Sequence, residues 1–493
     1  MTEEDGEGKP AGEEKPADDG GSRAPFSPPY RFDRTASAAA VVDRWADLAA
    51  GDESGEVVSV AGRVLRLRPQ GKLAFAELRD ESGAVQLLAF GKSTDDFDAF
   101  VRLHLGDWIG ARGEVVRTPR GELSVKVADW ALLAQARRSF GDKWRGIADV
   151  EIRYRQREVD LWANERSREI LRLRSRLIQR LRERLWADGF VEMETPILHP
   201  VAGGATAKPF VTHHNALDID LHLRIAPEIF LKRLVIGGFE KIFEIGRMFR
   251  NEGISPRHNP EFTSLEAYQA YADYRDVADL FERLVAGVAE DLVGTTRLTY
   301  QGRPLDLTPP WRRATVSELI EERTGLRLDV RSPVAELRRA AADHGVPAEA
   351  GWGPAKLLLG LYEKTAEATL WDPVFVMDYP VEATPLQRRH RDDPALVERF
   401  EIVIAGMEMG VADTELVDPD DQRARFEEQA AARAAGDEEA TDVDHEYLRA
   451  MEYGLPPLAG LGIGIDRLVM LLADVASIRE VIAFPTLRPE RLS

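Results

Sequence analysis

The sequence has no cysteine, no long apolar run and no excess of basic residues. The absence of cysteine from all 493 residues excludes disulfides and thiolate metal sites, so any metal must be bound by oxygen or histidine. No run of about 18 apolar residues suggests a membrane span. A net charge of −20 argues against broad affinity for nucleic-acid backbones, which requires clustered Lys and Arg, although it leaves room for a local basic face.

The chain is too long for a single hydrophobic core, so two or three domains are expected. No positively charged, apolar leader opens it, and the expected location is the cytoplasm. Residues 1–30 are rich in Glu, Asp, Gly and Pro and almost lack large apolar side chains. Such a segment buries too little surface to offset its ordering entropy, and we expect a disordered acidic tail.

Short strand patterns alternate with turns over residues 57–133. Five such segments with Gly at bends predict an OB-type barrel, a fold that binds nucleic acid on exposed aromatics. The alternative is a small all-β domain without a ligand. With an expected amphipathic helix over 37–50, this domain is assigned to residues 31–136.

A segment at 137–164 connects the barrel to the rest of the chain. It carries Arg153, Arg155 and Arg157, which predict either a solvated face or contact with a nucleic-acid backbone. A long amphipathic helix is expected over 165–188, before Gly189. Residues 165–493 form the expected second domain, with a helical insertion at about 315–370.

Residues 223–274 carry the pattern on which the functional interpretation of the chain depends. A strand pattern over 241–249 ends in Arg250, residues 251–260 form a loop with breakers, and a second strand follows from Glu261. One face of this second strand carries Phe262, Ser264, Glu266 and Tyr268. An aromatic ring, a carboxylate and a phenol on one face suit a planar group beside a cationic one.

In this arrangement Phe262 can stack on a base, and Glu266 with Tyr268 can bind an ammonium group. Arg250 can grip a phosphate or carboxylate in two places. Arg257 and His258 add positive charge over a polyphosphate. The simpler interpretation is an antiparallel hairpin with a solvated charged loop.

Two glutamates are predicted to share a sheet face in the segment 400–418. If Ala405 and Gly406 form a two-residue turn, Val403 faces Glu408 and Glu401 lies diagonally opposite it. Unpaired carboxylates repel each other, so a divalent cation is their natural partner. The alternative is two surface glutamates.

Glycine alternates with other residues at Gly460, Gly462 and Gly464, just before Asp466 and Arg467. Glycine at every second position clears one face of a strand, so that a planar ligand can lie against the backbone. The spacing differs from the dinucleotide-binding fingerprint.

These motifs carry a family resemblance. FRNEGISPRHNPEFTSLE resembles the second signature motif of class II aminoacyl-tRNA synthetases, GFVEMETPIL the first and AGLGIGIDRLVMLL the third. The flanking RIAPEIFLKRLVIGGFEKIFEI and AYADY resemble the lysyl enzymes of subclass IIb. The resemblance extends from about Val57 to the C-terminus, in the family's order.

The resemblance implies an α+β fold, with a class II antiparallel sheet flanked by helices after an all-β OB-fold barrel. It implies ATP-dependent attachment of lysine to tRNA(Lys) through a lysyl-adenylate, with Mg²⁺. It also implies a homodimer built on the 165–188 helix and the strand containing Pro196.

The roles of individual residues follow from the same resemblance. The ATP-binding residues are Arg250, Glu252, His258, Phe262, Glu401 and Arg467, of which Arg250 and Arg467 are catalytic. The amino-acid-binding residues are Gly204, Glu228, Arg250, Glu266, Tyr268, Val411, Asp413 and Glu415. Glu401 and Glu408 hold Mg²⁺, and Phe75, Gln86 and Asp129 read the anticodon. Glu228 has a simpler alternative, as an acid complementing a helix dipole.

Two positions depart from the family pattern. Many lysyl enzymes have Asn where Val411 stands and Phe or Tyr where Asp413 stands. The second change removes apolar contact worth about 1 to 3 kcal/mol and adds a charge that must be hydrated or paired. Either the pocket accepts a larger or more polar cationic amino acid, or binds lysine weakly, or Asp413 turns towards water and lysine binds as usual.

The sequence is compatible with three other functions. One is an adenylating paralogue that activates another cationic amino acid or transfers it to an acceptor other than tRNA. Another is a tRNA-binding regulator without activity, which retention of Arg250, Arg467 and Phe262 opposes. The third is an aspartyl or asparaginyl enzyme, whose acidic substrate would meet like charge at Glu266 and Glu415.

Overall fold

The computed structural model describes residues 26–138, 149–205, 207–349, 351–383, 385–434 and 442–489. The expected acidic tail lies outside these residues up to position 25. The chain divides into two compact units, Met1–Gly146 and Ile147–Ser493. Each unit is described by itself.

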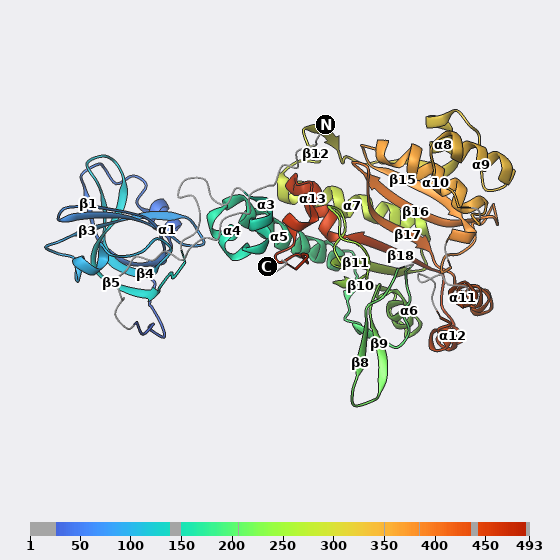
Figure 1. Ribbon diagram of the computed structural model, residues 1–493, viewed down its shortest axis with the longest axis horizontal. Coiled ribbons are helices and arrows are strands. Elements are labelled where there is room, and N and C mark those ends of the chain that lie inside the picture. Colours follow the sequence, from blue (N-terminus) through green and yellow to red (C-terminus); the bar gives the residue numbers. More distant parts are fainter. Residues whose placement is uncertain are drawn as a thin grey trace, which may run out of the picture. The chain divides into compact units, whose positions relative to one another are not determined.

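The first unit is a closed five-stranded barrel of order β1-β2-β3-β5-β4 (Figure 1). Its strands are β1 Glu53–Gln70, β2 Leu73–Arg79, β3 Ala84–Phe90, β4 Trp108–Arg117 and β5 Leu123–Ala134. All pairs are antiparallel except β3 with β5. Alternate side chains such as Ala74, Ala76 and Leu78 are buried inside, which leaves the intervening side chains on the outer surface. The five predicted strands are confirmed.

Two short helices accompany the barrel, α1 Ala38–Arg44 and α2 Phe97–Phe100. The sequence predicted a helix over 37–50, which is too long. Ser37 caps the N-terminus of α1 with its side chain, and the residues after Arg44 form turns that end at Gly51, whose φ is +93°. Glycine there supplies the left-handed conformation that other residues adopt rarely.

The second unit is built on an eight-stranded sheet of order β14-β15-β16-β17-β18-β11-β10-β6 (Figure 1). Its strands are β6 Val191–Glu192, β10 Lys241–Phe249, β11 Glu261–Ala270, β14 Arg312–Thr315, β15 Val374–Pro380, β16 Leu396–Ile404, β17 Met407–Thr414 and β18 Leu458–Gly464. The expected antiparallel sheet is present, and only the pairs β10–β6 and β14–β15 at its ends are parallel.

One face of this sheet packs against helices. Leu265 and Ala267 of β11 are buried there with Ile463 of β18 in the main core, together with side chains of α5 Glu165–Ala187, α7 Tyr274–Val293 and α13 Ile465–Ala473. Since side chains alternate along a strand, Ser264 and Glu266 point to the opposite face. That opposite face carries the candidate site.

The remaining elements surround this frame. The helices are α3 Val150–Arg155, α4 Arg157–Ala163, α6 Glu228–Ile236, α8 Val316–Thr324, α9 Val334–Asp343, α10 Pro354–Thr365, α11 Pro419–Ala434, α12 His445–Met451 and α14 Ile478–Val481, with the 3₁₀ turns Glu367–Thr369 and Val381–Ala383. Two smaller sheets are β12 Arg297–Tyr300 with β13 Arg303–Asp306, and β7 Leu198–His199, β9 Ile219–Leu223 and β8 Val211–His214. Helices α8 to α10 lie within the expected insertion, and their buried side chains share a second core with residues of β14, β15 and β16.

The arginines of the connecting segment do not form a solvated face, which was one of the two expectations for them. Arg157 is buried, with its side chain 1% exposed and paired with Asp160 at 2.6 Å. Its guanidinium also donates to the carbonyls of Glu480 and Ala483. Because the partners lie near the C-terminus, Arg157 fixes α4 to the body of the second unit. None of the helices among the described residues is long and apolar enough to cross a membrane.

Candidate active site

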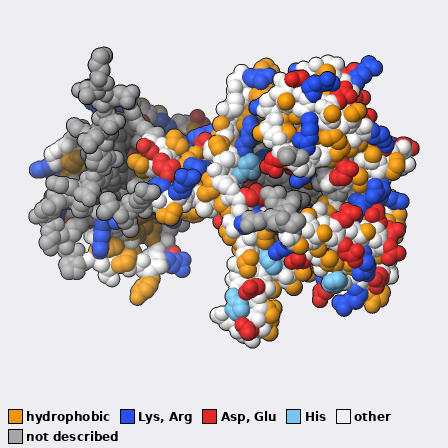
Figure 2. Space-filling view, turned by 45° about the vertical axis from the view of Figure 1, so that its right-hand side comes forward, with side chains coloured by type: hydrophobic (Ala, Val, Ile, Leu, Met, Phe, Trp, Pro, Cys, Tyr) orange, Lys and Arg blue, Asp and Glu red, His pale blue; other side chains and the backbone are white. Residues whose placement is uncertain are grey.

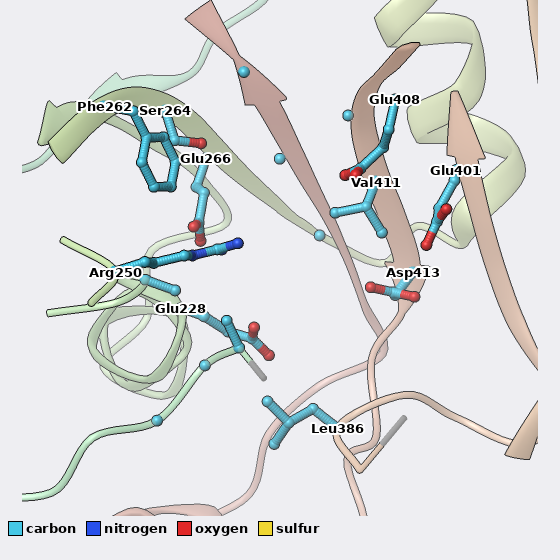
Figure 3. Close-up of a pocket in the computed structure, with 18 of the residues that line it drawn as sticks. Glu228, Arg250, Phe262, Ser264, Glu266, Leu386, Glu401, Glu408, Val411 and Asp413 are labelled. Carbon is cyan, nitrogen blue, oxygen red and sulfur yellow. The ribbon is translucent and has the colours of Figure 1, made fainter. Parts of the chain in front are cut away.

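A cavity of about 460 Å³ opens on the free face of the large sheet, and its labelled lining residues are drawn in Figure 3. Two rows of residues on neighbouring strands line the base of this cavity. Tyr268, Gly460 and Asp413 form one row, and Glu266, Gly462 and Val411 form the next. The predicted common face of β11 and the alternating glycines of β18 therefore meet in one cavity.

Gly460 allows two groups that line the cavity to approach each other above the strand. A Cβ at this position would lie 2.1 Å from Oε1 of Glu415 and 2.6 Å from Cε1 of Tyr268. No side chain fits there without displacing both groups. The glycine strand thus makes room for Tyr268 and Glu415, whose end of the cavity we call the amino-acid end because the resemblance places the amino acid there, and it provides a flat surface at Gly462 and Gly464.

Glu266 and Tyr268 form a hydrogen-bonded pair at this end. The Tyr268 hydroxyl donates to Oε2 of Glu266 at 3.1 Å. Burial raises the pKa of Glu266 to about 8, and the nearby Glu228 carboxylate raises it further while Arg250 opposes the rise. A carboxyl group with such a pKa ionises readily when a cation binds beside it.

Lys232 is a residue of this end that the sequence analysis missed. It is fully buried, and its ammonium pairs with Oε1 of Glu228 at 2.5 Å and with Glu415. The available signal was its position four residues after Glu228, which places both on one face of α6. Two of the expected amino-acid-binding acids therefore already share a cation within the protein.

Asp413 does not turn towards water. It is buried, its carboxylate lies 3.4 Å from Nη1 of Arg399, and Nε2 of Gln387 donates to Oδ2 at 3.2 Å. Burial raises the pKa of Asp413 to about 6, against the opposing charge of Arg399. The expectation of a solvated Asp413 is wrong, because Arg399 lies opposite it in the β16–β17 register and supplies a buried counter-charge.

Gly204 and Glu228 lie together at the entrance to α6. Gly204 has a φ of +88°, and a Cβ there would lie 3.0 Å from Cβ of Glu228. The backbone conformation and the close approach both require glycine. Figure 3 places the Glu228 carboxylate across the cavity from Val411 and Asp413.

Arg250 lies between the two ends of the cavity, next to Phe262 (Figure 3). Its guanidinium carbon is 5.1 Å from the centre of the Phe262 ring, a cation–π contact. The stacking ring and the anion-binding fork predicted from the sequence are thus adjacent. Glu252 and His258, on the following loop, also line the cavity.

Arg467 connects the loop to the hairpin of β16 and β17. Its Nη1 donates to the Glu408 carbonyl at 2.5 Å and lies 3.4 Å from the Glu408 carboxylate, while Nη2 is 3.2 Å from Nε2 of His258. Partial burial and the charge of Arg467 lower the pKa of His258. His258 is therefore neutral at pH 7, and the positive charge at this end comes from the arginines.

Glu401 and Glu408 share one face, as the sequence predicted. The turn at Ala405 and Gly406 and the pairing of Val403 with Glu408 are confirmed, but the extra residue of the bulge is Met409 rather than Gly410. Figure 3 shows the two carboxylates extending into the same space. Burial raises the pKa of Glu367 to about 7, together with the charges of Glu401 and Glu408. Burial also raises the pKa of Glu401, and the charge of Glu408 adds to that rise.

This pair fits Mg²⁺ carried on a nucleotide. The described residues contain no group of three or more His, Cys, Asp or Glu placed to hold a metal. Two carboxylates supply two oxygen ligands, and Mg²⁺ commonly takes its remaining ligands from phosphates and water. Glu367, whose pKa the two glutamates raise, belongs to the segment between α10 and β15 and is remote in sequence from both.

On the barrel, Phe75 and Gln86 lie on the outward faces of neighbouring strands. Phe75 is paired with Leu88, and Gln86 with Glu77, so the two are diagonal neighbours. Gln86 accepts a hydrogen bond from Ser124 at 2.8 Å. Asp129 lies on β5 opposite Arg112, 3.8 Å from its guanidinium.

The family comparisons agree with both units. The family model for class II tRNA synthetases (D, K and N) matches residues 149–488, and that for the OB-fold nucleic acid binding domain matches residues 58–133. The chain belongs to the class II tRNA synthetases of the D, K and N group.

Three relatives similar to this chain are named lysine--tRNA ligase. A lysine--tRNA ligase of Nostoc punctiforme is 50% identical over 472 residues, covering 94% of this chain and 84% of the relative. Those of Carboxydothermus hydrogenoformans and Prochlorococcus marinus are 50% and 52% identical, each covering 94% of both chains. The recognised resemblance to lysyl enzymes is confirmed, and these relatives lend no support to a separate adenylating paralogue.

Proposed function

We propose that this protein attaches lysine to tRNA(Lys), using ATP to form lysyl-adenylate. The observation that carries the proposal is the acidic amino-acid end of the cavity, which is lined by Glu228, Glu266 and Glu415. Two ammonium groups suit this end, whereas the acidic substrate of an aspartyl enzyme would be repelled. The names of the relatives support the same activity.

In the first reaction, a lysine carboxylate oxygen attacks the α-phosphorus of ATP. The bond from that phosphorus to the bridging oxygen breaks, and pyrophosphate leaves with the electron pair. Arg250 holds the reacting carboxylate and α-phosphate together, and Arg467 neutralises charge on the leaving phosphates. In the second reaction, a hydroxyl of the terminal tRNA ribose attacks the lysyl carbonyl and AMP leaves. No protein nucleophile is required.

The nucleotide end orients ATP through the ring of Phe262 and the glycine strand. Glu252 and His258 contact the nucleotide from the loop, and Glu401 and Glu408 hold Mg²⁺. When bound, Mg²⁺ neutralises phosphate charge and fixes the phosphate conformation. At the other end, Glu228 and Gly204 receive the α-ammonium, and Val411 and Asp413 border the side chain.

The barrel reads the anticodon of tRNA. Phe75 offers a half-buried ring for base stacking, and Gln86 and Asp129 offer hydrogen-bonding groups that distinguish bases. On the second unit, the face visible in Figure 2 carries interspersed acidic and basic side chains. In complexes with nucleic acid, contacts to bases specify the sequence, whereas contacts to phosphates position the protein.

The protein acts as a homodimer. Exposed apolar side chains occur at the end of α5 and along the expected first-motif segment: Trp186, Val191, Ile197 and Leu198. Exposed apolar side chains close together in sequence support an interface on this segment. Sedimentation should therefore give a dimer, and Ile197→Glu with Leu198→Glu should give a monomer; a wild-type monomer would contradict this assignment.

Lysine-dependent exchange of pyrophosphate with ATP, followed by charging of tRNA(Lys), tests the function. Exchange with lysine in preference to the other standard amino acids, ornithine, hydroxylysine and β-lysine is expected, together with charging. Preference for another amino acid, or exchange without charging, would overturn the proposal.

A further inference from the structure

Arg174 of α5 approaches the large sheet from the face that the helices cover. Its side chain is 13% exposed, and its guanidinium pairs with the carboxylate of Asp466, which is 3% exposed. The same guanidinium donates through Nη2 to the Thr263 hydroxyl at 2.8 Å and through Nη1 to the Val481 carbonyl at 3.4 Å. One arginine of α5 is therefore bonded to β11, α13 and α14.

Asp466 extends the pairing of β11 with β18 beyond the last residue of β18. The ladder ends at the pair Ser264 and Gly464, where the chain enters α13. The Asp466 carboxylate then accepts the backbone N–H of Thr263 at 2.7 Å, a buried donor that needs an acceptor. Its other oxygen is bonded to Arg174. The Asp466 carboxylate thus ties the beginning of β11 to the first turn of α13.

Thr263 and Asp466 are the sequence neighbours of two residues at the nucleotide end. Thr263 follows Phe262, and Asp466 precedes Arg467. Successive side chains of a strand point to opposite faces, so Phe262 lines the cavity while Thr263 is directed towards the helices. The hydrogen bond between Thr263 and Asp466 therefore ties the backbone that carries Phe262 to the backbone that carries Arg467.

The position of α13 matters because Arg467 makes two contacts at once. Its Nη1 donates to the Glu408 carbonyl, and its Nη2 lies 3.2 Å from Nε2 of His258. Hydrogen bonds weaken steeply when their distance or angle leaves the normal range. A displacement of α13 would disturb both contacts and would move the Arg467 guanidinium relative to the Phe262 ring.

We propose that Arg174 is a positioning residue for the nucleotide end. It holds the Asp466 carboxylate and the Thr263 hydroxyl, and through these neighbours it sets the placement of Phe262 relative to Arg467. A guanidinium suits this role because its planar fork can bind a carboxylate and a hydroxyl together, whereas an ammonium acts as a point charge. The inference rests on the proposed function, in which Phe262 and Arg467 bind ATP.

The pair of Arg174 and Asp466 also contributes to folding. Removal of one partner leaves a largely buried charge without its counter-charge, which destabilises a protein. A general loss of stability would affect both ends of the cavity. A positioning role at the nucleotide end affects ATP binding and leaves lysine binding unchanged, so the two ligands must be measured separately.

Calorimetric titrations of the full chain with ATP and Mg²⁺, and separately with lysine, make this distinction. Arg174→Met should raise Kd for ATP at least about tenfold, since small misplacements of binding groups have large effects. Kd for lysine should stay within about twofold of the wild-type value. Arg174→Lys keeps a charge beside Asp466 without the fork, and its Kd for ATP should lie between the two.

Thr263 provides a conservative pair of variants. Thr263→Val removes the acceptor for Arg174 and should raise Kd for ATP about threefold, whereas Thr263→Ser keeps the hydroxyl and should bind ATP as the wild type does. Arg184→Met is the matched control. Arg184 lies about 15 Å further along α5 and donates to the Asp291 carboxylate and the Gly287 carbonyl of α7, so its loss should leave ATP binding unchanged.

Circular dichroism checks folding, and Arg174→Lys with the two Thr263 variants carries the test if Arg174→Met does not fold. A folded Arg174→Met that binds ATP as the wild type does overturns the inference. Equal weakening of ATP and lysine binding also overturns it, and so does a Thr263→Val that matches Thr263→Ser. Absence of ATP binding by the wild type would instead refute the proposed function.

Discussion

The two ends of the cavity differ in how their charged side chains are placed. At the amino-acid end, Lys232, Glu415 and Asp413 are buried, and their charges are matched within the protein. At the nucleotide end, Glu252 and His258 are exposed on a loop. The first end holds its charged groups in buried ion pairs, while the second presents charged and polar side chains to solvent.

Burial makes the first end sensitive to the loss of a single partner. Among the described residues, Asp413→Ala leaves Arg399 paired with Glu401 alone, and it should lower the free energy of unfolding by about 3 kcal/mol. Urea unfolding measures this change. Asp279→Ala removes an exposed partner of Arg313 and should cost less than about 1 kcal/mol.

The addition of Arg399→Met to Asp413→Ala should recover most of the loss, since both charges are then gone. If Asp413→Ala and Asp279→Ala destabilise the protein equally, the contrast between buried and exposed charge pairs fails.

Arg250 joins the two ends and should affect chemistry more than stability. Arg250→Ala is expected to reduce kcat of lysine-dependent pyrophosphate exchange by about 100- to 1000-fold, because it removes a preorganised charge from the reacting groups. Arg283→Ala, an exposed arginine of α7 paired with Asp188, is the control and should retain wild-type exchange. An Arg250→Ala enzyme with unchanged kcat would remove the residue from the mechanism.

The raised pKa of Glu266 predicts a pH dependence confined to the amino-acid end. Below about pH 8 the free enzyme carries this group protonated, and binding of the ammonium requires the ionised form. KM for lysine should therefore fall by up to about tenfold per unit as pH rises from 6 to 8. Initial rates at saturating ATP measure this profile.

Glu266→Gln should show weak binding without that profile. A wild-type KM for lysine that does not change over this range would show that Glu266 is already ionised in the free enzyme.

The smallest effect is expected at the exposed loop. His258→Ala removes a neutral ring next to Arg467 and should raise KM for ATP by about threefold, with unfolding free energy unchanged within about 0.5 kcal/mol. KM for lysine should not change. An equal rise in both constants would indicate that the two ends are not independent.

Local patterns predicted most of the elements that hold the site. The period-two face of β11, the turn at Ala405 and Gly406, and the alternating glycines each follow from rules that act over a few residues. The helix after Ser37 was predicted too long, since the pattern alone did not reveal the turns after Arg44. Lys232 was visible in the sequence only as a neighbour of Glu228 on one helix.

The sequence by itself determined the class of protein, because motif order and the spacing of Arg250, Phe262, Glu266 and Arg467 are properties of the chain. Only the tertiary structure decided the charge state of the pocket. Arg399 faces Asp413 from another strand, and Lys232 reaches Glu415 from a helix about 180 residues away in sequence. The energy of a buried charge depends on its spatial neighbours, and these are set by packing rather than by spacing along the chain.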